Sequence, residues 1–357
     1  MDSTKLLHPF VFYLSAALAI FRYLQTGFFS LRRIPILFTI VDTVISLYFR
    51  LCGLSPFTID LDDQTTMHFW TSNHRRFNKP NLVMIHGYGG DARWQFVYQV
   101  GSLSQNFNLY VPDLLFFGQS SSKRSGRTDA FQARCLAECL KRFGVDRFSV
   151  YSISYGGFVA YRMAEICPEE VEKVVIVSSG VGSSDDQIEE QIKKIGRDPA
   201  EILLPKHPQD LRLLVNLSVY KCKPLRWLPD FFLQEFINAL MFFAMARVAS
   251  QVMVNHQRKE KLELLEHLLA KKALISLPIL TQETLLVWGD QDNVFPVNLA
   301  YQLQRHLGPR SRVKIIKEMG HAANIESPDA VNDLITSFVL GRSKWDIPSD
   351  SEKFNFS

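Results

Sequence analysis

The sequence contains little cysteine, and its cysteines follow neither a metal-binding nor a disulfide pattern. The five are Cys52, Cys135, Cys139, Cys167 and Cys222. Their number is odd, none forms a CxxC pair, and none stands at ligand spacing from a histidine, so the sequence predicts neither a disulfide framework nor a zinc site. We expect the domain to fold in a reducing compartment and to need no metal and no cofactor.

An excess of charge of either sign is also missing. The chain has 40 lysines and arginines against 36 aspartates and glutamates, a formal net charge of +4. No basic stretch interleaved with aromatic residues follows a helix or a strand, which argues against binding to nucleic acid. With 357 residues, 47% of them hydrophobic, the chain can bury a large core, and one domain carrying an insertion is the simplest expectation.

No apolar run reaches the ~20 uninterrupted residues that a membrane-spanning helix needs. The run Phe10–Leu24 contains Arg22, and the run Ile34–Leu51 contains Asp42 and Arg50. Four interpretations are open for this N-terminal part: a signal peptide, a spanning anchor, a pair of interfacial helices, or a helical pair buried against the domain.

We favour membrane attachment without cleavage for residues 1–55. Cleavage after the first run would leave the apolar residues 34–51 as a new N-terminus, and the cysteine pattern does not support secretion. The protein is therefore expected to be associated with a membrane, with the rest of the chain facing the cytosol.

The pattern after Pro56 predicts a hairpin followed by a mostly parallel sheet. Residues 57–61 and 66–70 alternate in polarity around a polar turn, as the strands of an antiparallel hairpin do. Beyond them, short apolar runs alternate with segments of helical periodicity, which is typical of strands buried on both faces between layers of helices. These runs cover residues 82–85, 109–111, 148–150, 174–177, 285–288 and 313–316.

The segment between the strands at 174–177 and 285–288 is too long for a simple crossover. It is rich in helix formers, and an insertion after a parallel strand lies at the carboxyl edge of the sheet, where ligands bind. We predict a helical cap inserted after the sixth strand, in which the Phe and Met residues of 231–253 either bury the cap or line a lipid-accepting channel. The predicted division is 1–55 for the N-terminal segment, 56–180 and 284–345 for the core, 181–283 for the cap and 346–357 for the tail.

Three residues with complementary chemistry each follow a predicted strand. Ser154 stands on a strand-to-helix turn, Asp292 follows the strand at 285–288, and His321 follows the strand at 313–316. A histidine can take the serine proton and return it to a leaving group while an aspartate orients the ring. Asp290 is a rival to Asp292 as the acid, and Ser154 alone could be a helix N-cap.

The run His86-Gly87-Tyr88-Gly89-Gly90 directly follows the strand at 82–85. Its glycines allow backbone N–H groups to turn towards a developing oxyanion. We predict that the amides of Tyr88 and Tyr155 form this oxyanion hole and that His86 holds the loop without transferring protons.

Five motifs follow one another along the chain: His86-Gly87-Tyr88-Gly89-Gly90, Pro112-Asp113-Leu114-Leu115-Phe116-Phe117-Gly118-Gln119-Ser120, Ser152-Ile153-Ser154-Tyr155-Gly156-Gly157, Gly289-Asp290-Gln291-Asp292 and Gly320-His321. On these motifs the chain resembles, from Leu82 to about Leu340, the α/β-hydrolase superfamily, in particular its monoacylglycerol-lipase-like and ring-cleavage-hydrolase-like branches. The residues of these motifs and the N-terminal apolar segment look most like those of plant members. One departure is Ser152, where such proteins usually carry glycine; we expect the turn to form with slightly altered packing.

The resemblance and the three residues imply a serine hydrolase acting on lipid-like or aromatic esters through an acyl-enzyme. Alternatives that keep the same triad are a hydrolase-fold ligand receptor with slow or no turnover, an acyltransferase, and a hydrolase of carbon–carbon bonds. Epoxide hydrolysis is disfavoured, because that branch of the fold carries a carboxylate where this chain has Ser154.

Overall fold

Short runs of buried aliphatic residues form the strands at the centre of the molecule. The computed structural model describes residues 36–221, 228–238, 257–270 and 277–342. The order across the sheet is β1-β2-β4-β3-β6-β7-β8-β9, with β5 paired to β2. The strands are β1 (Leu54–Asp60), β2 (Thr65–Ser72), β3 (Asn81–Ile85), β4 (Asn108–Pro112), β5 (Ser121–Ser122), β6 (Phe148–Ile153), β7 (Val171–Val177), β8 (Glu283–Gly289) and β9 (Ser311–Ile316).

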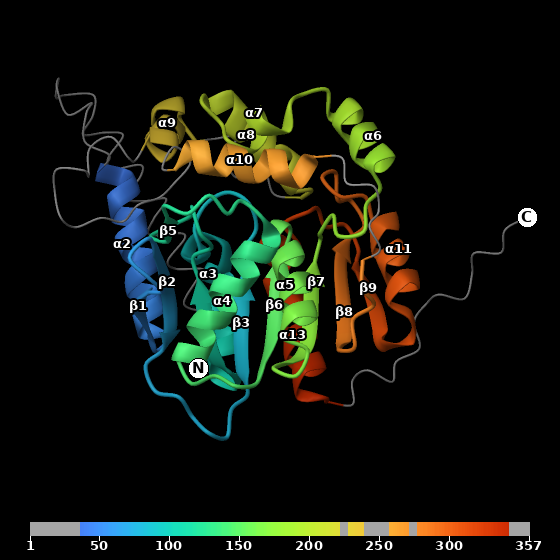
Figure 1. The fold of residues 1–357 in the computed structure, drawn as a ribbon. Helices are drawn as coiled ribbons and strands as arrows, with labels where there is room; N and C mark the ends of the chain where they lie inside the picture. Colours follow the sequence, from blue (N-terminus) through green and yellow to red (C-terminus); the bar gives the residue numbers. More distant parts are fainter. Residues whose placement is uncertain (1–35, 222–227, 239–256, 271–276, 343–357) are drawn as a thin grey trace, which may run out of the picture.

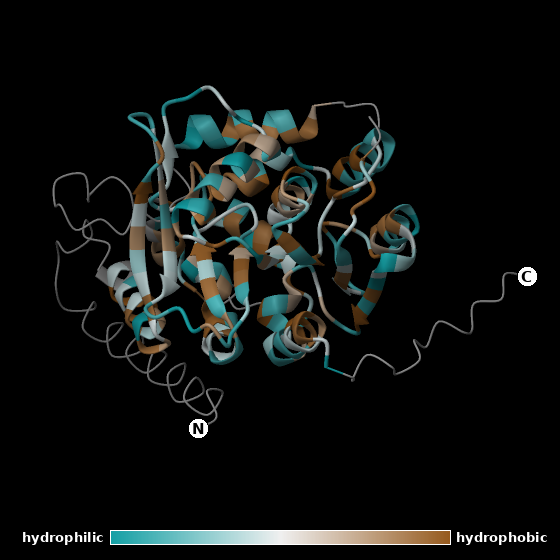
Figure 2. Ribbon diagram, turned by 60° about the horizontal axis from the view of Figure 1, so that its bottom comes forward, coloured by the Kyte–Doolittle hydropathy of each residue, from teal (hydrophilic) through white to brown (hydrophobic). Residues whose placement is uncertain are grey.

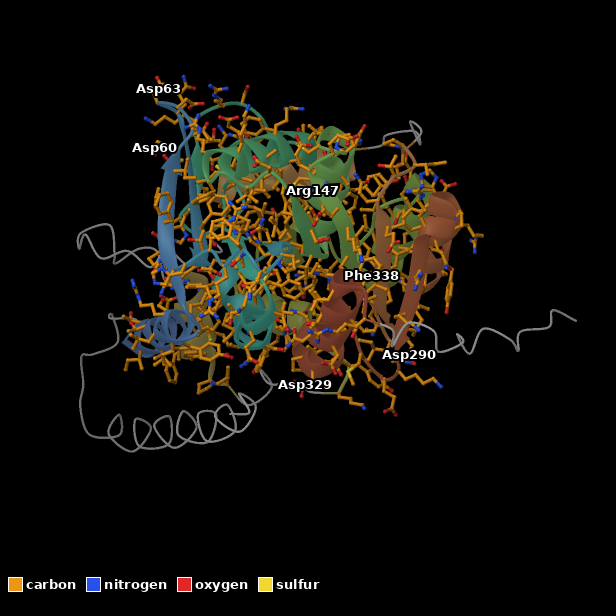
Figure 3. All side chains as sticks on the ribbon, turned by 90° about the horizontal axis from the view of Figure 1, so that it is seen from below. Asp60, Asp63, Arg147, Asp290, Asp329 and Phe338 are labelled. Atoms are coloured by element: carbon orange, nitrogen blue, oxygen red, sulfur yellow. The ribbon has the colours of Figure 1, made fainter. Side chains whose placement is uncertain are left out.

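Strand directions agree with the sequence prediction. β1 and β2 form an antiparallel hairpin in which Leu54 pairs with Ser72 and Asp60 with Thr66, and Asp60 and Asp63 mark its turn at one edge of the molecule (Figure 3). β2 also runs antiparallel to β4, whereas the strands β4, β3, β6, β7, β8 and β9 are parallel to one another. The prediction of a mostly parallel sheet is confirmed.

Helices cover both faces of the sheet (Figures 1 and 2). Successive residues of a strand point to opposite sides, so strands made of apolar residues throughout need cover on both. One core cluster joins α4 and α5 to one face, and a second joins α2, α3 and α13 to the other. Figure 2 shows hydrophobic residues along the strands and on the helix sides that meet them. The helices flanking the sheet are α2 (Ile36–Leu51), α3 (Ala92–Asn106), α4 (Asp129–Arg142), α5 (Tyr155–Ile166), α11 (Asn298–Leu307), α12 (Ala323–Glu326) and α13 (Pro328–Leu340), with a 3-10 turn at Gly308–Arg310.

A layer of helices crosses the carboxyl ends of the strands (Figure 1). It lies between β7 and β8 in the chain. The sequence did not predict the two-residue β5, so β7 corresponds to the sixth predicted strand, after which the insertion was expected. Residues 239–253, which carry much of the predicted Phe- and Met-rich run, lie outside the described residues, as does the tail from 343. The helices are α6 (Asp185–Ile195), α7 (Pro199–Leu203), α8 (Pro208–Ser218), α9 (Asp230–Asn238) and α10 (Arg258–Leu269).

The second N-terminal apolar run forms α2, which packs on the domain through the buried residues Ile45 and Phe49. The first run, Phe10–Leu24, lies outside the described residues. Within the described part of the chain, every helix is too short or too polar to cross a lipid bilayer.

Asp42, which interrupts the apolar pattern of α2, belongs to a buried ionic network. The Arg93 guanidinium lies 2.9 Å from the carboxylate of Asp42 and 2.7 Å from that of Asp91, and the Trp94 indole N–H donates to Asp42 at 3.2 Å. Asp91 is also the N-cap of α3, accepting from the Trp94 amide. One arginine therefore joins the N-terminal helix to the start of α3.

Replacing Arg93 by methionine should leave two buried carboxylates without their cation. Breaking a buried ion pair in this way costs about 3–5 kcal/mol, so we expect Arg93→Met to lower the free energy of unfolding by that amount in chemical denaturation. Exchange of the exposed Arg147, which pairs with Glu172 at the surface, for methionine is the matched control and should cost under about 1 kcal/mol. Equal losses for the two variants would contradict this account.

Candidate active site

Ser154 occupies a strained turn between β6 and α5. Its backbone has φ 54° and ψ −121°, a region that non-glycine residues rarely adopt and that costs on the order of 1–3 kcal/mol. The turn is held by close approach of the chain on both sides. A side-chain carbon at Gly156 would lie 2.4 Å from the Ile85 carbonyl oxygen, and one at Gly157 would lie 2.4 Å from Ser179 Oγ. The packing that glycine permits forces the Ser154 side chain out at the carboxyl edge of the sheet.

Ser152, the departure from the family pattern, is accommodated inside β6. Its side chain is fully buried, and its hydroxyl donates to the Val175 carbonyl of β7 at 3.0 Å. The extra hydroxyl is thus satisfied between two strands, and the turn at Ser154 forms two residues later.

His321 lies between Ser154 and Asp292. Its Nδ1 is 3.0 Å from Asp292 Oδ2, and its Nε2 is 3.0 Å from Ser154 Oγ. Because a carboxylate can only accept, Nδ1 carries the proton, which leaves Nε2 to accept from the serine hydroxyl. The structure therefore brings together, in hydrogen-bonding order, the three residues that the sequence predicted.

The acid in contact with the histidine is Asp292. Its side chain is fully buried, and its Oδ1 accepts from the amides of Val294 and Phe295, each at 2.8 Å. Two backbone donors hold the carboxylate with its second oxygen towards His321. The rival Asp290 lies at the end of β8 (Figure 3), and its Oδ1 has no partner among the described residues.

The loop His86–Gly90 runs beside the serine, since a side-chain carbon at Gly87 would lie 2.9 Å from Ser154 Cβ. His86 is fully buried and holds the loop as predicted: Nδ1 donates to the Gly87 carbonyl at 2.7 Å, and Nε2 accepts from the Leu114 amide at 2.9 Å. Burial lowers the pKa of His86. Both ring nitrogens are therefore engaged within a neutral imidazole.

Two amides point to the oxyanion prediction. Among the described residues, no acceptor is bonded to the backbone N–H of Tyr88 or of Tyr155, and the rings of these tyrosines meet edge to face at 6.0 Å. Both amides therefore lack an acceptor, as the predicted oxyanion hole requires, and a donor to an oxyanion contributes on the order of 3 kcal/mol of transition-state stabilisation.

Gln95 on α3 supports this loop and was missed from the sequence. Its Oε1 accepts from the Gly87 amide at 2.7 Å, and its Nε2 donates to the carbonyls of Gly87, at 3.1 Å, and of Gly89. One side chain thus sets the loop from outside it. The only sequence signal for this role is the position of Gln95 in the first turns of the helix that follows the glycine run, and that position alone does not predict the contact.

Asp113 holds the loop after β4 through several contacts. Its carboxylate accepts from His68 Nδ1 at 2.9 Å and from the amides of Ala92 and Gln119. Burial alone would raise the pKa of Asp113, but the hydrogen bond and charge of His68 oppose it and lower the pKa to about 2. The loop after β4 is therefore tied to β2 and to the start of α3.

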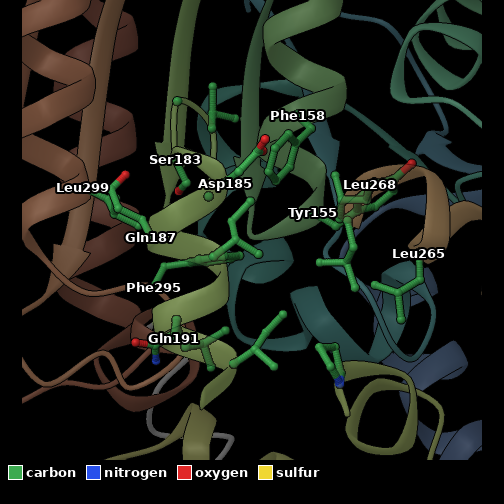
Figure 4. A pocket seen from close by; sticks show the side chains of 18 of the residues that line it. Tyr155, Phe158, Ser183, Asp185, Gln187, Gln191, Leu265, Leu268, Phe295 and Leu299 are labelled. Carbon is green, nitrogen blue, oxygen red and sulfur yellow. The ribbon is translucent and has the colours of Figure 1, made fainter. Parts of the chain in front are cut away.

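A cavity of about 780 Å³ lies between the cap helices and the core (Figure 4). Tyr155, next to the serine, lines it, as does Phe295, whose ring is 5.5 Å from that of His321. Ser154 and His321 do not line it themselves. Leu265 and Leu268 of α10 lie across the cavity from Phe295 and Leu299 (Figure 4), so an apolar chamber adjoins the reactive groups. Within the described ranges, no cluster of three or more His, Cys, Asp or Glu side chains could hold a metal ion.

Comparison with known proteins agrees with this fold. A family model described as alpha/beta hydrolase fold matches residues 80–328. Lipase 1 of Psychrobacter immobilis is 25% identical over 264 residues, which cover 72% of this chain and 76% of that protein. A 2-hydroxy-6-oxononadienedioate/2-hydroxy-6-oxononatrienedioate hydrolase of Pseudomonas sp. is 25% identical over 272 residues, which cover 72% of this chain and 87% of that protein.

Solved structures show the same fold. A membrane phospholipase A superposes with a TM-score of 0.67 at 22% identity, over 95% of this chain and 98% of that chain. A 2-hydroxy-6-oxo-6-phenylhexa-2,4-dienoate hydrolase from Rhodococcus sp. strain RHA1 gives 0.64 at 19% identity, over 80% of this chain and 99% of that chain. The resemblance to plant members stays a prediction.

The two aspartates of the loop after β8 can be separated by reactivity of the serine. We expect Asp292→Asn to slow labelling of Ser154 by a fluorophosphonate by about four orders of magnitude, because the amide no longer selects the tautomer of His321. Asp290→Asn should label within a few-fold of the parent chain, since Asp290 does not touch the histidine. The reverse pattern would assign the acid to Asp290.

Proposed function

The chain belongs to the alpha/beta hydrolase fold family, and from that premise we propose that it is a serine hydrolase that cleaves carboxylic esters of lipid-like or aromatic compounds. The observation that carries the proposal is the continuous row of hydrogen bonds from Ser154 through His321 to Asp292. Relatives named lipase and pimeloyl-[acyl-carrier protein] methyl ester esterase support ester hydrolysis.

The proposed reaction assigns one role to each of these groups. Ser154 Oγ attacks the ester carbonyl while His321 Nε2 takes its proton, and the amides of Tyr88 and Tyr155 hold the oxyanion. Collapse of this intermediate expels the alcohol, which leaves with the proton from His321. Water then attacks the acyl-enzyme with His321 again acting as base, and the carboxylic acid departs from the restored serine. These steps use groups of the chain itself and require no cofactor.

The cavity beside the site supports an apolar substrate. Aliphatic side chains of α6, α8 and α10 line much of it, and its volume lies near the upper end of the ~300–1,000 Å³ typical of pockets for small ligands. An acyl chain placed there would leave water at roughly 0.8 kcal/mol per methylene. This favours esters of longer acids over acetate esters.

A second candidate reaction keeps the same groups. Two of the similar proteins are named as hydrolases of 2-hydroxy-6-oxo acids, and hydrolysis of a carbon–carbon bond in such a compound would also use a serine, a histidine and an oxyanion hole. Turnover of a vinylogous 1,5-diketo acid in preference to esters would favour this candidate.

Membrane attachment through residues 1–55 is also part of the proposal. Ile40, Leu47 and Leu51 of α2 are exposed on the side away from the domain, and the run Phe10–Leu24 precedes them in the chain. Such an arrangement would place a lipid-cleaving site at its substrate. Flotation of the full chain with phospholipid vesicles is the measurement that decides it.

Ester hydrolysis is tested with p-nitrophenyl butyrate. We expect multiple turnovers by the parent chain and a loss of about four orders of magnitude in kcat for Ser154→Ala, because the nucleophile is removed. Ser152→Gly, which removes the other hydroxyl of this turn, is the matched control and should keep both turnover and fluorophosphonate labelling. Equal rates for Ser154→Ala and the parent chain would end the proposal.

The role of the cavity is tested by filling it from α10. Leu268→Trp should lower kcat/KM for a dodecanoyl ester by at least tenfold and leave an acetyl ester nearly unchanged, since an indole would occupy the space of the chain but not that of the carbonyl. Leu262→Trp lies on the exposed side of the same helix and should change neither rate. An equal effect of Leu268→Trp on both esters would show that the chain lies elsewhere.

A further inference from the structure

The helix α10 contacts both the cavity and the loop His86–Gly90, which we call the oxyanion loop. Leu264, Leu265 and Leu268 line the cavity on one side of the helix. In its first turn, the carbonyl of Lys261 accepts a hydrogen bond of 2.6 Å from the hydroxyl of Tyr88. One helix therefore joins the cavity, where the proposed function places the acyl chain, to the residue whose amide is a proposed oxyanion donor.

Packing holds the Tyr88 side chain in this position. Its ring meets the Phe117 ring edge to face at 5.2 Å, and the Lys261 ammonium lies 5.1 Å above the same Phe117 ring. Burial raises the pKa of Tyr88, so its hydroxyl remains a donor. The oxyanion loop and the first turn of α10 thus share one aromatic support and one hydrogen bond.

Other bonds hold α10 to the core without touching the oxyanion loop. Glu263 pairs with Arg127 at 2.8 Å, and the Gln257 side chain at the start of the helix donates to the Ser120 carbonyl at 3.0 Å. These contacts anchor the helix in general. They make it possible to separate the effect of anchoring from that of the Tyr88 hydroxyl.

We propose that the Tyr88 side chain is a specificity-determining positioning residue that couples filling of the cavity by an acyl chain to the geometry of the oxyanion hole. An acyl chain against Leu264, Leu265 and Leu268 would set the position of α10. The Lys261 carbonyl moves with that helix, and the Tyr88 hydroxyl moves with the carbonyl. The amide of the same residue is then brought to its place beside Ser154.

This inference rests on the proposed ester hydrolysis, and its consequence is kinetic. Binding energy that improves the placement of an oxyanion donor appears in kcat, whereas energy felt equally by bound substrate and transition state appears in KM. A misplacement of catalytic groups by about 1 Å costs up to about 100-fold in rate. Longer acyl chains should therefore raise kcat as well as lower KM.

The experiment compares p-nitrophenyl esters from acetyl to dodecanoyl with the full chain, Tyr88→Phe and Glu263→Gln. In the parent chain we expect kcat to rise with acyl length. In Tyr88→Phe, kcat for the longest ester should fall about threefold to tenfold, the effect of one lost hydrogen bond, and its dependence on acyl length should disappear while KM still falls with length. Glu263→Gln should keep the rise in kcat.

Three results would overturn the inference while leaving ester hydrolysis intact: a parent kcat that ignores acyl length, a Tyr88→Phe series parallel to that of the parent, or a Glu263→Gln series that loses the rise as well. Absence of both turnover and fluorophosphonate labelling in the parent chain would remove the proposed function and the inference together. Should Tyr88→Phe fold poorly, Phe117→Leu weakens the shared support while keeping the hydroxyl, and it should also flatten the rise in kcat.

Discussion

The geometry of the site depends on the close packing of one turn, the strand-to-helix passage at Ser154. The helix α5 starts so near the end of β3 that no side chain fits at Gly156, and the backbone of Ser154 accepts a positive φ to make the passage. That conformation aims the hydroxyl at His321 and leaves the Tyr155 amide at the first turn of the helix, where no carbonyl of the preceding turn can accept from it. The proposed nucleophile and one proposed oxyanion donor thus depend on the same strained turn, which the packing of the surrounding sheet maintains.

A second constraint reaches the same site from the N-terminal side. The ion pair of Asp42 with Arg93 fixes α2 against the start of α3. Gln95, which follows Arg93 in the same helix, forms hydrogen bonds with the loop that carries Tyr88. Charged groups in a core are costly unless paired and hydrogen-bonded, so this network admits few alternative arrangements of α2 and α3. The sequence pattern assigns α2 to the apolar N-terminal segment. In the folded chain, α2 also supports the oxyanion loop through its contact with α3.

Sequence reasoning predicted the parts of this molecule that have a local signature. Buried parallel strands are continuous apolar runs, and Ser154, Asp292 and His321 each follow such a run, so their meeting at one edge of the sheet could be expected before the structure was known. The physical pattern of the sequence does not distinguish Asp290 from Asp292. The difference lies in the fold, where two backbone amides donate hydrogen bonds to the carboxylate of Asp292. Gln95, the pairing of Asp42 with Arg93, and the bond from Tyr88 to Lys261 join residues whose partnership leaves no period or motif. Such contacts are decided by packing between elements, which composition and spacing do not encode.

The cavity and the reactive groups are adjacent but separate, and this separation bears on selectivity. Tyr155 and Phe295 stand between the chamber and the Ser154–His321 pair, each contacting the chamber with its side chain. Under the proposed function, a small ester would need only the triad and the two amides, because it has no chain to place in the chamber. In the proposed reaction, discrimination among acyl groups would come from apolar burial beyond these two aromatic residues, where each methylene adds free energy but no new polar contact. Hydrophobic burial alone discriminates only modestly between substrates that differ by one methylene. A mechanical link from the chamber to an oxyanion donor would sharpen that discrimination, because the same burial would then act on the transition state as well as on binding.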